Sequence, residues 1–276
     1  MQSNLDTKTV EGFGEEWSRF DQSEVDEREL ATQFERYFSV FPWDSLPDSA
    51  EGFDLGCGSG RWAKFAASRV GKLHCIDASS AALAVARRNL EGAGNVEFHE
   101  ASVDAIPLDD GSMDFGYSLG VLHHIPDTAA GIKACVAKLK PGAPFLAYLY
   151  YAFDNRPAWF RGLWAVSDAF RRVIASLPFG AKRLVTDAIA VSVYLPLATA
   201  ALVFEKAGMN VDPLPLSAYR RHSFYTMRTD ALDRFGTRTE HRFTREQIRQ
   251  MMESAGLESI EFSDGDPYWC AVGVRR

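Results

Sequence analysis

The segment Asp54-Leu55-Gly56-Cys57-Gly58-Ser59-Gly60 carries the residues of this sequence best suited to chemistry. Its three glycines have no Cβ, so the backbone can approach a ligand closely. A helix that begins at Arg61 would offer free N–H groups to a carboxylate. The spacing differs from the G-x-G-x-x-G of dinucleotide-binding turns, because position 61 is Arg. Asp54 and the later Asp77 supply anionic groups suited to an ammonium and a ribose diol.

The elements that must position this loop belong to an alternating pattern. From Glu51 to about Tyr151, short apolar runs alternate with helical patterns, which is typical of βαβ units and a parallel sheet. The loop follows the first strand directly, and Asp77 ends the second. The expected strands are Gly52–Leu55, Lys72–Ile76, Asn95–His99, Met113–Ser118 and Phe145–Tyr151.

The alternation breaks after Tyr151, where two consecutive helical patterns replace a single crossover. The second, from about Lys182 to Lys206, is more uniformly apolar, and we expect a kink at Pro196. The stretch from Val211 to Phe243 has little periodicity. The first pattern forms one helical stripe that ends at Pro178 and consists of Trp159, Leu163, Val166, Phe170, Val173 and Leu177.

Regular structure is expected again after this insertion. Thr244-Arg245-Glu246-Gln247 is a capping-box pattern that opens a helix ending near Ala255-Gly256. Leu257–Phe262 and Trp269–Val274 read as two strands joined by a short loop. Such a loop requires the two strands to be antiparallel.

Several motifs together resemble those of class I S-adenosylmethionine-dependent methyltransferases. The resemblance is to the small-molecule, type 11 subgroup, which includes ubiquinone/menaquinone C-methyltransferases and many natural-product and sugar methyltransferases. It covers about residues 50–151. Its motifs, in order, are Asp54–Gly60, Asp77, residues 106–114 (IPLDDGSMD), residues 122–127 (LHHIPD) and residues 139–142 (LKPG).

The resemblance implies an α/β fold, with a Rossmann-like, mostly parallel seven-stranded sheet whose last strand is antiparallel, plus an inserted helical cap. We expect an N-terminal helical lid over residues 1–50. Residues 51–151 and 244–276 would form the cofactor-binding core, and residues 152–243 an inserted cap and acceptor-binding region. In the family, the N-terminal region often folds over the cofactor. The alternative is that its aromatic residues only cover the sheet edge.

The resemblance also implies which residues hold S-adenosylmethionine and its product S-adenosylhomocysteine. The glycines would line the methionine and ribose part of the cofactor. Asp54 would bind the amino group of the methionine part, and the Leu119 carbonyl would accept a hydrogen bond from the same ammonium. Asp77 would accept hydrogen bonds from both ribose hydroxyls. The usual adenine-binding Asp is replaced by Ser102, which leaves Ser102 or Asp104 for that contact. The expected cofactor-binding set is Asp54, Gly56, Cys57, Gly58, Gly60, Asp77, Ala78, Ser102, Val103 and Leu119.

Methyl transfer needs a base only for some acceptors, because the sulfonium is already activated. The candidate catalytic residues are His123, Tyr151, Asp154 and His222, whereas His124 fits a packed or hydrogen-bonded position under its loop. Arg220 and Arg221 form either a solvated loop or a site for an anionic acceptor. The expected acceptor-binding residues are Trp17, Asn155, Arg156, Tyr219, Arg220 and Arg221. No metal site is expected.

Composition narrows the function further. The 276 residues carry 30 Lys and Arg against 37 Asp and Glu, a net charge of −7, which argues against nucleic acid as the partner. Cys57, Cys75, Cys135 and Cys270 form no C-x-x-C pair and read as reduced, buried thiols of a cytoplasmic protein. Residues 188–204 carry no charge, yet their polar residues and Pro196 favour a buried or interfacial helix over a membrane span.

The sequence therefore predicts an enzyme that transfers a methyl group to an O, N or C atom of a small-molecule acceptor, either anionic or apolar. One alternative is C-methylation of a prenylated quinone or another lipid. Another is a cofactor-binding regulatory subunit without catalysis. The apolar cap helices are also a candidate surface for a homodimer.

Overall fold

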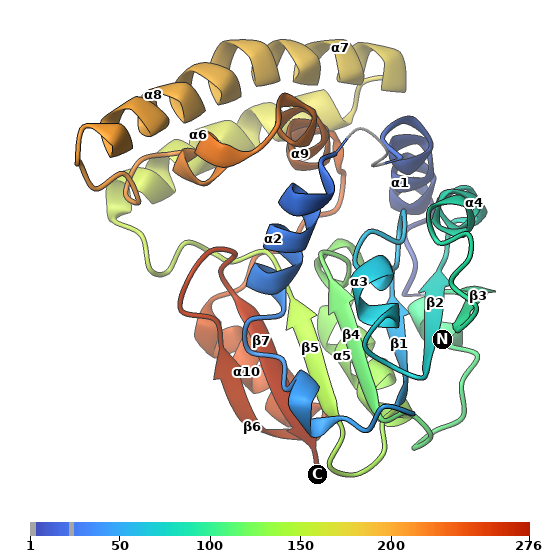
Figure 1. Ribbon diagram of the computed structural model, residues 1–276. Helices are drawn as coiled ribbons and strands as arrows, with labels where there is room; N and C mark the ends of the chain where they lie inside the picture. The colour runs from blue at the N-terminus through green and yellow to red at the C-terminus, as the bar shows by residue number, and fades with distance from the viewer. Residues whose placement is uncertain (1–3, 22–24) are drawn as a thin grey trace. The chain divides into compact units, whose positions relative to one another are not determined.

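The computed structural model describes residues 4–21 and 25–276 (Figure 1). By their internal contacts these residues divide into two units. The first contains residues 4–21, Leu30–Ala152 and Thr239–Arg276. The second contains residues 25–29 and Phe153–Arg238.

A seven-stranded sheet organises the first unit, with the order β3-β2-β1-β4-β5-β7-β6 (Figure 1). Strands β1 to β5 pair in parallel, and β7 runs antiparallel to both β5 and β6. The predicted sheet, with its antiparallel last strand, is confirmed. The strands are β1 (Glu51–Leu55), β2 (Lys72–Asp77), β3 (Val96–Glu100), β4 (Phe115–Leu119), β5 (Pro144–Tyr148), β6 (Leu257–Phe262) and β7 (Cys270–Arg275).

Helices cover both faces of this sheet. On one face, α5 (Thr128–Lys138) and α10 (Arg245–Ser254) pack on alternate strand residues such as Phe53 and Phe145. On the other, α2 (Glu27–Tyr37), α3 (Ala63–Ala67) and α4 (Ser80–Asn89) pack around Tyr117. Helix α1 (Thr7–Arg19) contacts α4. Successive side chains of a strand point to opposite faces of the sheet, so each of the two helical layers packs on every second residue.

Glycines allow β1 and β4 to pack closely. Gly52 is paired with Phe115, and Phe53 with Gly116. A Cβ on Gly52 would lie 2.3 Å from the Phe115 ring, and one on Gly116 would lie 2.4 Å from the Phe53 ring. Each ring therefore fills the space that the opposite glycine leaves, and this fixes the register next to the glycine-rich loop.

The second unit is helical. Its elements are α6 (Ala158–Ala175), α7 (Phe179–Ile189), η4 (Ala190–Tyr194), α8 (Leu195–Lys206), η5 (Ser217–Arg221) and α9 (Phe224–Gly236). The elements α7, η4 and α8 form one helix over Phe179–Lys206. The irregularity expected at Pro196 takes the form of the π-helical stretch η4, because Pro196 has no N–H for the carbonyl four residues earlier.

Helix α9 was not predicted, because it lies in a stretch whose sequence has little periodicity. Ser223 caps its first turn by accepting from the Thr226 N–H. Its buried side is part polar, with Thr226 and Thr229 beside Met227, Ala231 and Leu232. Because threonines occupy positions that an apolar residue normally fills, the helical period is weak in the sequence.

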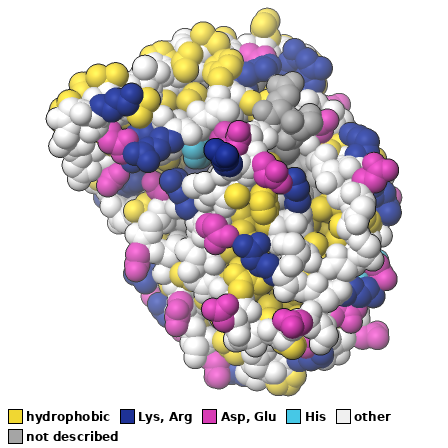
Figure 2. Space-filling view, viewed as in Figure 1, with side chains coloured by type: hydrophobic (Ala, Val, Ile, Leu, Met, Phe, Trp, Pro, Cys, Tyr) yellow, Lys and Arg dark blue, Asp and Glu magenta, His cyan; other side chains and the backbone are white. Residues whose placement is uncertain are grey.

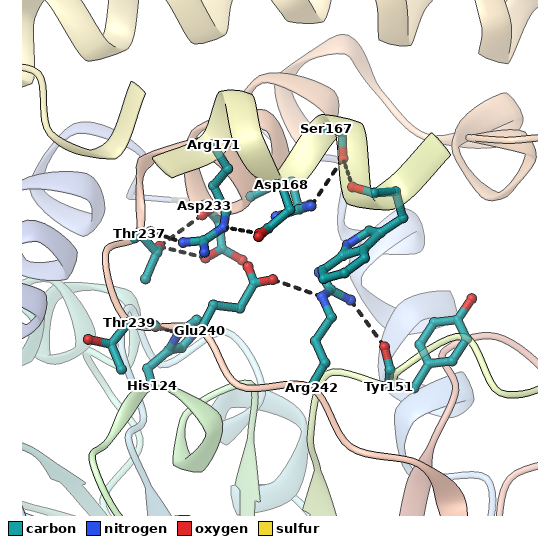
Figure 3. Close-up of polar contacts among 12 residues, drawn as sticks. His124, Tyr151, Ser167, Asp168, Arg171, Asp233, Thr237, Thr239, Glu240 and Arg242 are labelled. Carbon is teal, nitrogen blue, oxygen red and sulfur yellow. Dashed lines mark hydrogen bonds and ion pairs between the residues drawn. The ribbon is translucent and has the colours of Figure 1, made fainter. Parts of the chain in front are cut away.

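Polar contacts of α6 fix its inner side. Arg171 donates from Nε to Asp168 at 2.7 Å and from Nη1 to the Thr237 carbonyl, directly after α9, at 2.9 Å (Figure 3). Both side chains are buried. The side of α6 that faces α9 is therefore charged and paired.

Candidate active site

The glycine-rich loop between β1 and α3 has little room for side chains. Gly56, Gly58 and Gly60 have φ angles of +78°, +54° and +77°, a region that L-residues with a Cβ rarely adopt. A Cβ on Gly56 would lie 2.3 Å from Val121 Cγ2, and one on Gly58 would lie 2.9 Å from Trp17 Nε1. The loop is thus a cradle of bare backbone that any larger residue would fill.

Asp77 ties this loop to the end of β2. Its Oδ2 accepts from the Gly58 N–H and its Oδ1 from the Ser79 N–H, each at 2.9 Å. Desolvation raises the pKa of Asp77, and these N–H groups offset part of the rise. The side chain is partly exposed, so its remaining lone pairs can accept from a ligand hydroxyl. Asp77 therefore orders the loop and also offers the acceptor that a ribose diol needs.

Asp54 is a buried carboxyl group at the carboxyl end of β1. Burial raises its pKa from 3.8 to about 8, and the Tyr117 hydroxyl and Arg61 offset part of this rise. Although Tyr117 lies close, Asp54 Oδ2 and the Tyr117 hydroxyl do not meet hydrogen-bond geometry, and neither has another partner among the described residues. Such a group is costly to bury without a partner, so it points to a cationic or hydrogen-bond-donating ligand.

The other predicted cofactor residues also lie at the carboxyl edge of the sheet. Leu119 ends β4 beside β1, and Ser102 follows β3, where it caps the short helix Val103–Ala105 without a side-chain bond. Asp104 instead accepts from the Asn4 N–H at 2.6 Å. The Cys75 thiol and burial raise the pKa of Cys57, so its thiol stays protonated. Ala78 lies between Asp77 and Ser79, both of which contact the loop or its neighbouring helix.

Helix α1 lies against the glycine-rich loop. Trp17 contacts Gly58, and the Arg61 guanidinium lies 5.4 Å from the Trp17 ring centre. Gly14 is needed where α1 meets α4, because a Cβ there would lie 2.6 Å from Ser79 Oγ. Asn89 donates to the carbonyls of both Asp21 and Ser59. These contacts hold the N-terminal helix against the loop, and its role as a lid stays a prediction.

His123 is fully buried at the end of β4. Its ring stacks on Tyr150, with 3.9 Å between ring centres, and neither ring nitrogen has a hydrogen-bond partner among the described residues. Burial lowers its pKa well below 6.5, so the imidazole is neutral. His124 Nδ1 instead donates to the Thr239 carbonyl at 2.7 Å (Figure 3). Burial thus disfavours a protonated His123, whose catalytic role stays a prediction, whereas His124 is held in a packed position.

Two residues that the sequence did not single out lie near the Tyr150 ring: Arg242 and the Glu240 carboxylate that pairs with it. Arg242 Nε donates to Glu240 at 2.8 Å, and Arg242 Nη1 donates to the Tyr151 carbonyl at 3.3 Å (Figure 3). The Arg242 guanidinium lies 5.0 Å from the Tyr150 ring centre, and the Glu240 side chain is only 1% exposed. The only signal in the sequence was a Glu-x-Arg pair within a charged stretch, where such pairs are common.

The remaining predicted residues belong to the second unit. Arg156 donates to the Asp212 carbonyl at 2.7 Å, while Asp154 and Asn155 are exposed. The rings of Tyr219 and His222 lie 5.6 Å apart. Arg220 and Arg221 each donate to Glu205 at 3.0 Å, so this carboxylate already pairs with both. Their role toward an acceptor stays a prediction.

A separate cluster lies on the sheet near the start of β2. Ligand atoms of His74, Glu97 and His99 come within 4.8 Å of one another. Lys72 Nζ contacts both Glu51 and Glu97, and His74 Nε2 lies 2.8 Å from Glu51. A protein cation thus already neutralises these carboxylates, and the expectation that the chain has no metal site stays a prediction.

The site fits the cofactor that the sequence motifs imply. One end of β1 and β2 brings together bare glycine backbone, the buried Asp54 carboxyl, whose Oδ2 has no partner among the described residues, and the partly exposed Asp77 carboxylate. These groups match an extended methionine chain, an ammonium and a ribose diol, respectively. Ligands in open α/β sheets bind at this edge.

Comparison with known proteins agrees with this site. Residues 53–142 match a family model described as a methyltransferase domain. Ubiquinone biosynthesis O-methyltransferases are similar: that of Azotobacter vinelandii is 37% identical over 91 residues, 32% of this chain and 39% of that protein. That of Marinobacter nauticus is 34% identical over 93 residues, again 32% and 39%. The chain thus spans about two fifths of the length of these relatives.

A solved structure shares the fold over nearly the whole chain. It is an O-methyltransferase family protein from Burkholderia thailandensis, 16% identical, with a TM-score of 0.54 over 98% of this chain and 60% of that one. At this identity the likeness establishes the fold alone.

Proposed function

We propose that this chain transfers the methyl group of S-adenosylmethionine to a small-molecule acceptor, because residues 53–142 match a methyltransferase domain and similar proteins are named as methyltransferases. The observation that carries the proposal is the buried Asp54 carboxyl, whose Oδ2 has no hydrogen-bond partner among the described residues, beside a glycine-rich loop that Asp77 holds. S-adenosylmethionine supplies an activated methyl group, and S-adenosylhomocysteine is the product.

The protein's part in this reaction is mainly placement. Asp54 would bind the amino group, Asp77 the ribose hydroxyls, and the glycine backbone the methionine chain. Helix α1, through Trp17, would exclude water from the reactive sulfonium. Holding donor and acceptor in line can provide effective molarities of about 10⁵–10⁸ M.

For the acceptor we propose a hydroxyl-bearing small molecule. The similar proteins from Azotobacter and Marinobacter are named as O-methyltransferases of ubiquinone biosynthesis, which favours oxygen over nitrogen or carbon. A hydroxyl is weakly acidic, so a base at its proton would help. His123, whose two ring nitrogens have no hydrogen-bond partner among the described residues, is the candidate of the first unit for this proton, although burial disfavours the imidazolium that would form. Tyr151, Asp154 and His222 remain candidate catalytic residues.

A lipid acceptor is the second candidate. The second unit exposes many large apolar side chains, which favours a prenylated quinone or a related lipid over a sugar. We further propose that residues 152–243 select the acceptor, that nucleic acid is not a partner and that the protein is cytoplasmic. The net charge of −7 supports the exclusion of nucleic acid.

Calorimetry with S-adenosylhomocysteine tests cofactor binding directly. We expect Asp77→Ala to weaken binding by about 1.5–3 kcal/mol, the value of a hydrogen bond to a charged group. Ser79→Ala, which keeps the backbone N–H that Asp77 accepts from, is the matched control. Absence of binding by the wild-type protein would refute the proposal.

Radiolabelled S-adenosylmethionine tests catalysis separately. Incubation with fractionated hydroxylated metabolites and lipids should label one class, and that class identifies the acceptor. Cofactor binding without label transfer to any fraction would instead indicate a regulatory subunit.

A further inference from the structure

Among the described residues, the exposed large apolar side chains are confined to one part of the chain. Fifteen large hydrophobic side chains are exposed among the described residues, and all fifteen lie between Trp159 and Phe224. Scattered single residues of this kind are normal, but a concentration in one unit marks an interaction surface.

The exposed stripe of α6 reverses the usual orientation of an amphipathic helix. Trp159, Leu163, Val166, Phe170 and Val173 follow the i, i+4, i+7, i+11, i+14 spacing of one helical face and are 51–64% exposed. The opposite side, where Asp168 and Arg171 lie, is the buried one. A soluble helix normally buries its apolar stripe, but none of the described residues covers this face.

The helix over Phe179–Lys206 also exposes apolar side chains. It is long and apolar enough to cross a membrane, and only 22% of its most apolar window is buried. Its exposed residues include Leu184, Val191, Leu195 and Val203. Figure 2 shows hydrophobic side chains along α7 and α8, with Lys and Arg side chains between them.

Contacts with α9 argue against a simple membrane span. Asp187 on α7 binds Arg228 on α9 through two hydrogen bonds of 2.9 and 3.0 Å, and Lys182 donates to the Gly236 carbonyl at 2.9 Å. One side of the helix is therefore engaged with a polar neighbour, and only the other is free for an apolar medium. This arrangement suits a helix lying in a bilayer interface.

The net charge of residues 153–238 indicates which kind of apolar surface these helices contact. Residues 153–238 hold 12 Lys and Arg against seven Asp and Glu, whereas the rest of the chain holds 18 against 30. Cations stand at both ends of the apolar helix, with Lys182 and Arg183 near its start and Lys206 at its end. A symmetric dimer through this face would bring two positive units together, whereas an anionic lipid surface attracts them.

We propose that the exposed apolar faces of α6 and of α7–α8 bind an anionic lipid bilayer, with these helices lying in its interface. The apolar stripes enter the region between headgroups and acyl chains, and Arg183 and Lys206, at the two ends of the helix, contact anionic headgroups. This surface is additional to the cofactor site and does not depend on methyl transfer.

Vesicle flotation of the full-length protein, without cofactor or acceptor, tests the proposal. We expect binding to phosphatidylcholine vesicles that contain phosphatidylglycerol, weaker binding to phosphatidylcholine alone, and further weakening with salt. The stripe variant Val166→Glu/Phe170→Glu should bind at least about tenfold more weakly. The control Ala165→Glu/Ala169→Glu adds the same charge at exposed positions of α6 outside the stripe and should lose less than about threefold.

A second variant separates charge from apolar contact. Arg183→Glu/Lys206→Glu, at the two ends of the apolar helix, keeps the stripes and should lose the preference for anionic vesicles. Circular dichroism and S-adenosylhomocysteine affinity should be unchanged in all three variants, because none of these residues lies in the cofactor site.

Other results would overturn the proposal. The first is a wild-type protein that binds neither kind of vesicle. The second is an equal loss of vesicle binding in the stripe variant and its control. The third is a wild-type dimer that the stripe variant converts to monomers. Loss of folding or cofactor affinity in the stripe variant alone would also do so, since the stripe would then pack inside the protein. The calorimetry that tests the proposed function is independent of all these outcomes.

Discussion

The buried carboxyl of Asp54 should make the stability of the protein depend on pH. Its pKa rises from 3.8 to about 8 on folding, so between these values the native state holds a proton that the unfolded chain has lost. Stability from this group is therefore present at low pH and declines as pH rises toward 8. We expect Asp54→Asn, which is neutral throughout, to gain on the order of a few kcal/mol relative to wild type between pH 5 and pH 8.

Urea unfolding of both proteins at several pH values measures this difference. Asp77 is present in both, so its own raised pKa affects the two curves similarly. Parallel curves across this pH range would mean that Asp54 is ionised in the native protein.

Gly56 in the glycine-rich loop and Gly142 in the turn before β5 separate the cost of a clash from the cost of a positive φ angle. Gly56 and Gly142 have φ angles of +78° and +82°, but only Gly56 has a neighbour, Val121, where a Cβ would stand. We expect Gly142→Ala to cost about 1–2 kcal/mol from conformation alone. Gly56→Ala should cost about 1–3 kcal/mol more and should weaken S-adenosylhomocysteine binding.

Chemical denaturation and calorimetry on the two variants check this prediction. Equal losses of stability with unchanged cofactor affinity in both would show that Val121 moves aside and that the loop tolerates a side chain.

At the scale of elements, α6 depends on a buried ion pair rather than on its apolar stripe. The Asp168 and Arg171 side chains are each 8% exposed, whereas Arg172, which also pairs with Asp168, is 75% exposed. We expect Asp168→Ala to cost about 3–5 kcal/mol, because Arg171 then remains buried without its carboxylate. Arg172→Ala should cost less than about 1 kcal/mol.

A double variant provides the control for this prediction. Asp168→Leu/Arg171→Met removes both charges and should recover most of the stability lost in Asp168→Ala, as followed by far-ultraviolet circular dichroism during denaturation. A double variant as unstable as the single one would assign the loss to packing instead.

Sequence patterns predicted the elements of the first unit well, because period and end signals there are local. The Thr244 capping box forms as expected, with Gln247 reaching back to the Thr244 N–H. The register of β2 against β3 brings His74 close to Glu97 and His99, and no local sequence pattern predicted this register. Pairing across strands depends on the whole sheet, so a single strand cannot specify it.

Side-chain environment was harder to predict than the element itself. The α6 stripe has a clear helical period, but a period does not state which side faces the protein. The helix α9 lacks a clear period because threonines share its buried face. At the candidate site, Asp54 and Asp77 follow from motif position, whereas the Glu240–Arg242 pair follows only from three-dimensional contact.

At the scale of the whole molecule, the insertion leaves and rejoins the first unit at neighbouring points. Tyr151 and Phe243 form a parallel bridge, and the Ala152 N–H donates to the Phe243 carbonyl at 2.8 Å. A short glycine-serine linker can therefore replace Phe153–Arg238 without stretching the sheet. All ten predicted cofactor-binding residues lie in the first unit, which the deletion leaves in place.

We expect this deletion to keep S-adenosylhomocysteine affinity within about threefold of wild type, since loop, Asp54 and Asp77 are retained. Methyl transfer and vesicle binding should both be lost, because the proposed acceptor region and the exposed apolar helices are removed together. Calorimetry, label transfer and flotation on the same preparation measure the three properties. A deletion variant that folds but no longer binds S-adenosylhomocysteine would show that the second unit takes part in the cofactor site. A deletion variant that still methylates the acceptor would instead place the acceptor site in the first unit, near His123.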